Sequence, residues 1–309
     1  MSQANPRRFT AEPASDQQFL LAEGPLWDAG RQRVLWVDIR GRLVLEGRLD
    51  GDRLATTGTH GMPGTVGVVV PAADGSLVVA AADGFALIDG DDVVLGPRVL
   101  PEGVDSRFND GAVDPAGRFL AGGMAEDGRK GEESLYRLDP DGTVHVVDQG
   151  LTLSNGLAWS LDGTTMYHAD SVPGVVHRRR YDPATGDLGP REPWLTFEGG
   201  VPDGLCTDAD GNVRVAVHGA GEVRAFAPDG EQLATVEVDA PHTTKPAFVG
   251  PDLDRLLITT ARDELSPEQR ERFPLSGRLF LADVGARGRP SPPWGGDAAT
   301  FRAALPGEA

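Results

Sequence analysis

The sequence predicts an all-β fold, specifically a six-bladed β-propeller. The first observation is a dipeptide, an acid or amide followed by glycine, at Glu23-Gly24, Asp110-Gly111, Asn155-Gly156 and Asp203-Gly204. The second is its period: with Gly67 and Ala247 included, successive positions are 43, 44, 45, 48 and 43 residues apart. The third is the β-prone character of every unit. Repeats of about 40–45 residues made of short strands are typical of propeller blades.

The elements of one unit follow each other in a fixed order. A short apolar run begins at the repeated glycine, and a polar turn such as Asp162-Gly163 separates it from a second β-prone run. The second runs are residues 33–37, 77–80, 118–121, 165–168, 213–217 and 255–259. Third runs at 134–138 and 222–226 precede further Asp-Gly turns. Each unit therefore reads as three strands joined by hairpins.

The six units follow one another without a linker, which predicts one domain over residues 1–309 with a core of about 19–285. The segment before the first unit, including Phe19-Leu20-Leu21, is placed to add a strand to the last blade. Such a strand would close the ring and cover an open sheet edge. The proline-containing tail, about 286–309, is expected to be an irregular surface segment.

Composition indicates an ordinary globular protein, with 39% hydrophobic and 25% charged residues. The longest apolar stretch, around Val66–Pro71, is too short to cross a bilayer, and Met1–Asp16 has no apolar segment like a signal peptide. Cys206 is the single cysteine, so an intramolecular disulfide is excluded. We therefore expect a cytoplasmic protein with no membrane partner and a buried, inert thiol.

The net charge of −18 argues against nucleic acid as a partner, because phosphate backbones are bound by clustered lysine and arginine. The basic cluster Arg178-Arg179-Arg180 is short and is expected to be a solvated blade edge. A small molecule is the expected partner, bound by a monomer or a small homo-oligomer.

The repeat places oxygen donors around one axis. The inner strand of each blade lines the central channel, so equivalent residues of different blades face one another. The repeated position holds Glu23, Asp110, Asn155 and Asp203, with Val66 and Pro246 in the other two blades. Carboxylates this close repel each other unless a cation lies between them. The sequence therefore predicts a metal site in the central channel.

The donor types limit the choice of ion. Carboxylate and amide oxygens suit hard cations such as Ca²⁺, Mg²⁺ and Mn²⁺. None of the six histidines lies in a close His-x-x-x-His or His-x-His spacing, so a histidine-rich zinc site is not expected. A single Asp-Gly is most often a turn, but four donors at one phase of a repeat favour the metal site.

Four motifs resemble the senescence marker protein, gluconolactonase and luciferin-regenerating enzyme family over about residues 23–284. The motifs are Glu23-Gly24-Pro25-Leu26-Trp27, Arg107-Phe108-Asn109-Asp110-Gly111 with Asp114 to Arg118, Ser154 to Ser160, and Pro202-Asp203-Gly204-Leu205. The resemblance implies a six-bladed propeller that binds a divalent metal in its channel. It also implies an enzyme that opens a sugar lactone to the aldonic acid.

The resemblance also implies roles for particular residues. The metal ligands fall on Glu23, Asn155 and Asp203, with Asp203 also the catalytic acid or base. The substrate-binding residues fall on Arg107, Asn109 and one of Glu126 and Asp127. One divalent ion is implied, which the ligand types favour as Ca²⁺, with Zn²⁺, Mn²⁺, Mg²⁺ or Fe²⁺ as alternatives.

The repeat and the family resemblance predict different roles for Asp110. The repeat makes it a ligand, whereas the resemblance puts Asn109 in the channel and Asp110 behind the ligands; we favour the second interpretation. Departures from the family pattern occur at Gly122-Gly123-Met124, at His218 and at His242 to Pro246. These are expected to line the mouth of the site and to affect which substrate it takes.

The chemistry leaves one alternative open. A cation on the carbonyl oxygen would stabilise the oxyanion formed when water adds to the lactone, and Asp203 would move the protons. Alternatively the ion itself activates the water and Asp203 is only a ligand. Arg107 and Asn109 would orient the sugar hydroxyls.

Two other functions remain as alternatives to the lactonase. The same cation would serve a hydrolase of another electrophile, such as a phosphotriester or an aryl ester. A calcium-binding regulator or a scaffold propeller is the non-enzymatic alternative, but it needs no Arg107-Phe108-Asn109 motif.

A second pattern concerns residues 15 positions after the donors: Asp38 after Glu23, Asp170 after Asn155 and His218 after Asp203. Each ends the second strand of its blade. They either brace the strands that carry the ligands or form ordinary turns at a strand end, and the turn is the simpler interpretation for the two aspartates.

Overall fold

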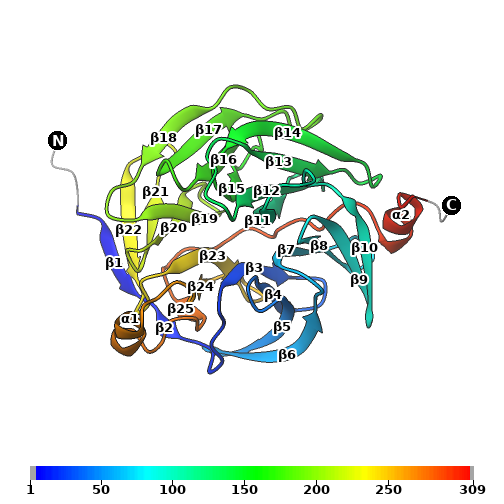
Figure 1. Ribbon diagram of the computed structural model, residues 1–309. Coiled ribbons are helices and arrows are strands. Elements are labelled where there is room, and N and C mark those ends of the chain that lie inside the picture. Colours follow the sequence, from blue (N-terminus) through cyan, green and yellow to red (C-terminus); the bar gives the residue numbers. More distant parts are fainter. Residues whose placement is uncertain (1–4, 307–309) are drawn as a thin grey trace.

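The computed structural model describes residues 5–306, and Figure 1 shows them as six sheets arranged around a central axis. Blade 1 comprises β3 (Ala22–Asp28), β4 (Arg33–Asp38), β5 (Leu43–Asp50) and β6 (Arg53–Gly61). Blade 2 comprises β7 (Val66–Pro71), β8 (Leu77–Ala81), β9 (Gly84–Asp89) and β10 (Asp92–Arg98). Blade 3 comprises β11 (Ser106–Val113), β12 (Phe119–Ala125), β13 (Glu133–Leu138) and β14 (Val144–Leu151).

The remaining blades complete the ring. Blade 4 comprises β15 (Ser154–Trp159), β16 (Thr165–Asp170), β17 (Val175–Arg180) and β18 (Glu192–Thr196). Blade 5 comprises β19 (Val201–Thr207), β20 (Val213–His218), β21 (Glu222–Phe226) and β22 (Gln232–Glu237), and blade 6 comprises β23 (Thr243–Val249), β24 (Arg255–Thr260) and β25 (Phe280–Ala282). The short helices α1 (Pro267–Arg272) and α2 (Ala298–Ala303) lie outside the sheets. The predicted all-β, six-bladed β-propeller is confirmed.

The N-terminal segment joins two blades. β2 (Glu12–Pro13) pairs antiparallel with β25 and forms the outer strand of blade 6, while β1 (Arg7–Thr10) pairs parallel with β22 of blade 5. The strand that completes the last blade is therefore Glu12–Pro13. The expected Phe19-Leu20-Leu21 lies between β2 and β3 and contributes a single bridge, from Leu21 to Ala261.

The C-terminal tail is more ordered than its prolines suggest. Figure 1 shows it crossing the middle of the propeller from blades 5 and 6 toward blades 2 and 3 before ending in α2. Gly288 N donates to Leu253 O on one side, and Trp294 N donates to Pro71 O on the other. Trp294 is fully buried and its indole N–H donates to Asp139 O at 3.2 Å. Residues 289–293 are irregular and mostly exposed, whereas Trp294 and α2 depart from the expected irregular surface segment.

The core lies between the blades. Val37 of blade 1 packs with Val66 and Val79 of blade 2, and Leu205 of blade 5 packs with Tyr167 of blade 4. Inner strands such as β7 are buried along their whole length because each is covered by its neighbours on both sides. Within residues 5–306, no helix is long and apolar enough to cross a membrane.

Candidate metal and substrate site in the central channel

A β-bulge interrupts every inner strand at the level of the repeated dipeptide. The pairing shifts between Glu23 and Leu26, Val66 and Val68, Phe108 and Gly111, Ser154 and Leu157, Pro202 and Leu205, and Thr243 and Pro246. A bulge opposes an extra residue to the partner strand and re-aims the side chains there. The β-bulge at the repeated motif therefore changes the direction of the side chains on each inner strand.

The bulges relate the residues of blades 3, 4 and 5, whereas in blade 1 the bulged residues are Gly24-Pro25 and Glu23 directly precedes them. In blades 4 and 5 the two bulged residues are Asn155-Gly156 and Asp203-Gly204, and in blade 3 they are Asn109-Asp110. Asn109, rather than Asp110, thus shares the position of Asn155 and Asp203. Counting from Gly111 places the repeat of blade 3 one residue late, which is why the period alone points to Asp110.

The glycines of these dipeptides permit close approach of adjacent inner strands. A Cβ on Gly67 would lie 2.3 Å from Asn109 O, and one on Gly156 would lie 2.4 Å from Leu205 N. A Cβ on Gly204 would lie 2.3 Å from Lys245 Cγ. In these blades the dipeptide is no turn, and its glycine is required because a narrow channel brings the next blade too near for a side chain.

A cavity of about 140 Å³ opens at one end of the channel, and five of the predicted residues line it together. They are Glu23, Arg107, Asn109, Asn155 and Asp203. Each is nine-tenths or more buried. Leu21, Met124, Leu153, Val201 and Ala261 complete an apolar wall, and Arg40, Ser171, His218, Asp263 and Glu264 add polar groups.

The two acidic residues of the cavity, Glu23 and Asp203, are both buried and lie near enough for their charges to interact. Burial, followed by the charge of Asp110, raises the pKa of Glu23 to about 8, although Lys245 opposes the rise. Burial and the nearby charge of Glu23 raise the pKa of Asp203 well above its usual range. Both shifts favour the protonated acids, so ionising Glu23 and Asp203 together calls for positive charge beyond that of Lys245, which a bound cation would supply.

The amide of Asn155 also favours a cation in this cavity. Its Nδ2 donates to Ser171 Oγ at 3.1 Å, and that hydroxyl donates to Pro202 O at 2.6 Å, which fixes the amide between blades 4 and 5. Asn155 Oδ1 is buried and has no hydrogen-bond partner. A buried acceptor beside two buried carboxylates fits an oxygen-binding divalent cation.

The donors are two carboxylates and one amide. Among residues 5–306, no group of three or more His, Cys, Asp or Glu side chains comes together as a metal site. The fit to a cation therefore depends on the amide oxygen of Asn155 as the third donor, and leaves further positions for substrate or water oxygens.

The structure distinguishes Glu126 from Asp127. Arg107 Nε donates to Glu126 Oε1 at 2.5 Å, and Arg40 donates to the other oxygen at 2.9 Å. Asp127 instead lies on the surface and pairs with Arg129 at 2.8 Å. Glu126 does not line the cavity itself but contacts its wall through Arg107 and Arg40, and Asp127 stays outside it.

The aspartates at the strand ends hold the segments that precede the ligand strands. Asp38 accepts from Leu20 N and Leu21 N as well as from Gly41 N of its own turn. Asp170 accepts from Thr152 N and Leu153 N, just before β15. These contacts match the bracing interpretation, and for Asp38 a local turn is present as well.

His218 takes a different role at its equivalent position. Its ring stacks on His242, with centroids 4.1 Å apart and planes 21° from parallel. Burial lowers the pKa of His218 to about 4, so that the pair is neutral near pH 7. The stacked imidazoles give one side of the cavity mouth a flat aromatic surface.

Sequence reasoning placed Lys245 at the mouth of the site with the rest of residues 242–246, whereas it lines the second cavity, and it missed Ser171. Lys245 lies in the bulge of blade 6 and is buried in the channel, where it binds Asp110. The repeat contains this position, but a pattern of oxygen donors does not single out a lysine. Ser171 follows Asp170 directly, yet no spacing distinguishes it from other serines.

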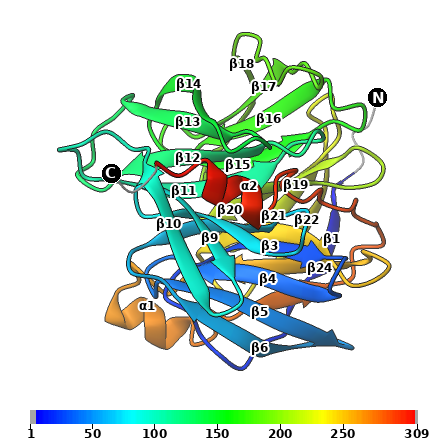
Figure 2. The ribbon, with the colours of Figure 1, turned by 90° about the vertical axis from the view of Figure 1, so that its right-hand side faces the viewer.

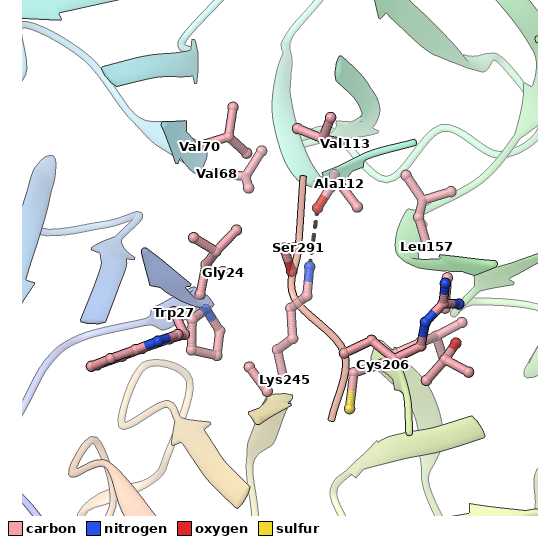
Figure 3. A pocket seen from close by; sticks show the side chains of 18 of the residues that line it. Gly24, Trp27, Val68, Val70, Ala112, Val113, Leu157, Cys206, Lys245 and Ser291 are labelled. Carbon is pink, nitrogen blue, oxygen red and sulfur yellow. Dashed lines mark hydrogen bonds between the residues drawn. The ribbon is translucent and has the colours of Figure 1, made fainter. Parts of the chain in front are cut away.

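A second cavity, of about 340 Å³, occupies the opposite end of the channel. Figure 3 shows Val68, Val70, Val113 and Leu157 around it, with Ser291 of the C-terminal tail lying across it. Cys206 lines this second cavity and is partly buried. Burial raises the pKa of its thiol to about 12, which makes it a poor nucleophile.

These features define a class of protein: a six-bladed propeller with oxygen donors and a buried arginine in a cavity at one end of its channel. Residues 21–262 match the model of a family described as the SMP-30/Gluconolactonase/LRE-like region. The chain belongs to this family.

Relatives match along nearly the whole chain. The pentonolactonase XacC of Haloferax volcanii is 36% identical, with 91% of this chain and 97% of the relative covered. The 6-deoxy-6-sulfogluconolactonase of Pseudomonas putida is 35% identical, with 91% and 97% covered. Among solved structures, the calcium-binding protein regucalcin of Agrobacterium tumefaciens has a TM-score of 0.87 at 29% identity, with 94% and 99% covered.

Proposed function

We propose that this protein is a divalent-metal-dependent hydrolase that opens a sugar lactone to its aldonic acid. The observation that carries the proposal is the convergence of Glu23, Asn155 and Asp203 with Arg107 and Asn109 in one cavity. Two relatives named as lactonases of sugar acids support the reaction class.

Glu23, Asn155 and Asp203 would hold the ion, and Ca²⁺ is favoured by the donor types. When bound, the ion supplies a Lewis acid that stabilises negative charge on the lactone carbonyl oxygen. The pKa values of Glu23 and Asp203 are raised by burial first and by neighbouring carboxylates second, and a bound cation would favour their charged forms.

Asp203 is the proposed proton carrier. Its carboxylate takes a proton from the attacking water and returns one to the ring oxygen that leaves as the ester bond breaks. The apolar wall formed by Leu21, Met124 and Val201 keeps bulk water from this carboxylate.

Arg107 and Asn109 are the proposed groups that orient the substrate. Both lie on β11 beside the donors, and both offer N–H groups that hydroxyls of a sugar accept from. Because their hydrogen bonds to each other and to Glu126 fix them in advance, little conformational freedom is lost when substrate binds.

Proton release from a panel of lactones tests the proposal. D-glucono-, D-xylono-, L-arabinono- and galactono-lactone are each offered to metal-stripped protein and to protein reloaded with Ca²⁺, Mn²⁺, Zn²⁺ or Mg²⁺, with Asp203→Ala as the control. Turnover that needs the metal and is lost in the variant supports the lactonase. Turnover of an aryl ester or a phosphotriester but of no lactone would transfer the proposal to those substrates.

A further inference from the structure

Lys245 and Asp110 form a buried ion pair inside the channel. Lys245 Nζ donates to Asp110 Oδ1 at 2.5 Å and to Gly111 O at 3.1 Å. The Asp110 side chain is fully buried, and that of Lys245 is 8% exposed. Figure 3 shows Lys245 extending from β23 across the channel toward the strand that carries Ala112.

The pair joins opposite sides of the ring. Asp110 is the second bulged residue of blade 3, and Lys245 is the second bulged residue of blade 6. Blades 3 and 6 are three positions apart in a ring of six, so these two residues face each other across the axis. The lysine and aspartate therefore meet because the same local device occurs in both blades.

Lys245 also touches the strand that carries Asp203. A Cβ on Gly204 would lie 2.4 Å from Lys245 Cβ, so the lysine stem runs directly over the backbone beside this donor. Lys245 lines the second cavity, whereas Glu23, Asn155 and Asp203 line the first. The ammonium group thus lies on the inner side of the donors, away from the mouth.

We propose that Lys245 is a positioning residue that neutralises the charge of Asp110 behind the metal donors by a fixed positive charge. The inference rests on the proposed metal site. With Asp110 paired, the channel offers a divalent ion two free carboxylates, from Glu23 and Asp203, and the loaded site is neutral. Without Lys245 the same ion would lie near three carboxylate charges, since that of Asp110 acts on the donors from behind the cavity, and the loaded site would keep one buried negative charge.

Neutrality matters because the donors Glu23, Asn155 and Asp203 are each more than nine-tenths buried. A single buried charge at several ångströms changes the affinity for a divalent ion by about tenfold or more. An ion held too tightly by three carboxylates would also be a weaker Lewis acid, because its charge is already compensated. Lys245 therefore affects how tightly the ion binds and how strong a Lewis acid it is, without contacting the ion.

Calcium titration into metal-stripped protein, followed by calorimetry, tests the inference without any lactone, and Mn²⁺ is titrated in parallel. Asp110→Asn keeps the shape of the side chain and an acceptor for Lys245, but leaves the lysine charge unpaired. It should weaken Ca²⁺ binding by about tenfold. Lys245→Met leaves Asp110 unpaired and should tighten Ca²⁺ binding by a similar factor, while the metal-free variant melts at a lower temperature.

The double variant Lys245→Met/Asp110→Asn removes both charges and should return the Ca²⁺ affinity to within about threefold of the wild type. If Lys245→Met does not fold, Asp110→Asn is compared with the double variant instead. Only the double variant should then bind Ca²⁺ with nearly wild-type affinity. Changes of the same sign in both single variants would overturn the inference and leave a merely structural pair. A wild-type protein that binds neither ion would overturn the proposed metal site and this inference with it.

Discussion

Arg107 Nη1 donates to Asn109 Oδ1 at 2.9 Å, so one channel residue sets the orientation of the other. Asn109 Nδ2 donates in turn to Ser154 O of blade 4 at 3.1 Å, which fixes both ends of the amide. Because the same guanidinium binds Glu126 through Nε, the planar fork of arginine, and not its charge alone, holds this wall of the cavity together.

Arg107→Lys keeps the charge but cannot bind Glu126 and Asn109 at once. We expect kcat/KM for the best lactone to fall by about 10–100-fold, since the substrate is no longer oriented. Steady-state kinetics measure the change, with Arg129→Lys as the matched control because Arg129 pairs with Asp127 on the surface. Equal kinetics for Arg107→Lys and the wild type would contradict the role of the fork.

Glu126 and Asp127 give a second matched comparison. Glu126→Gln weakens two charge-assisted hydrogen bonds, to Arg107 and to Arg40, and should raise KM by about tenfold. Asp127→Asn alters an exposed pair and should leave both kinetic constants unchanged. Equal effects of the two substitutions would show that neither side chain acts on the site.

Gly67→Ala tests why glycine follows the channel position. Its Cβ would lie 2.3 Å from Asn109 O and 2.9 Å from Phe108 O, both in the backbone of β11. We expect a loss of about 3 kcal/mol in the free energy of unfolding, measured by urea denaturation. Gly61→Ala is the control: no atom lies within 4 Å of its Cβ, and its stability should change by less than about 0.5 kcal/mol.

Asp170→Asn turns an amide group toward the backbone N–H groups of Thr152 and Leu153. The segment leading into Asn155 should shift, and Ca²⁺ affinity should fall by about tenfold in calorimetric titration. Asp162→Asn changes an exposed turn that accepts from Thr164 N and should leave the affinity as it is. Loss of stability in both variants with unchanged affinity would assign Asp170 to an ordinary turn.

The stability of the protein should depend on His168 in mildly acidic solution. This histidine is buried against Ser154 Oγ, at 2.8 Å from Nε2, and burial lowers its pKa from 6.5 to about 3. Between these values the unfolded chain binds a proton that the folded protein does not. The contribution of His168 to stability is therefore complete above pH 6.5 and is lost as the pH falls toward 3.

Between pH 6.5 and 5 this effect should remove about 2 kcal/mol from the free energy of unfolding. Urea denaturation of the wild type and of His168→Gln over this range measures it, since the difference between the two proteins removes the contribution of other titrating groups. Parallel pH profiles would mean that His168 is protonated equally in both states.

The architecture is predictable from sequence because each blade is built from local hairpins whose turns recur at one period. The exact position of each channel residue within its repeat is less predictable. In blade 3 the bulge lies one residue earlier relative to the glycine, so that Asn109, not Asp110, is the counterpart of Asn155. The choice between Glu126 and Asp127 depends on which neighbour reaches each carboxylate, and sequence does not contain that distance. The ion pair of Lys245 with Asp110 was not predicted, because only acids and amides were counted.

The tail was misjudged for a different reason. Its prolines indicate irregular backbone correctly for residues 290–293, yet irregular chain can still be buried when it lies between distant blades. Trp294 is fully buried against residues of blades 2 and 3, more than 150 positions earlier in some cases. No pattern in the local sequence predicts such a contact.

The pairing of β2 with β25 has a consequence for how the chain is made. Glu12 faces Leu281, so the ring cannot close until almost the entire polypeptide has left the ribosome. Hairpins within each blade can form during synthesis, whereas β2 is made first and stays unpaired until β25, near the other end of the chain, has been made. We therefore expect nascent chains to carry an open sheet edge for most of translation, and ring closure to be the last and slowest step of folding.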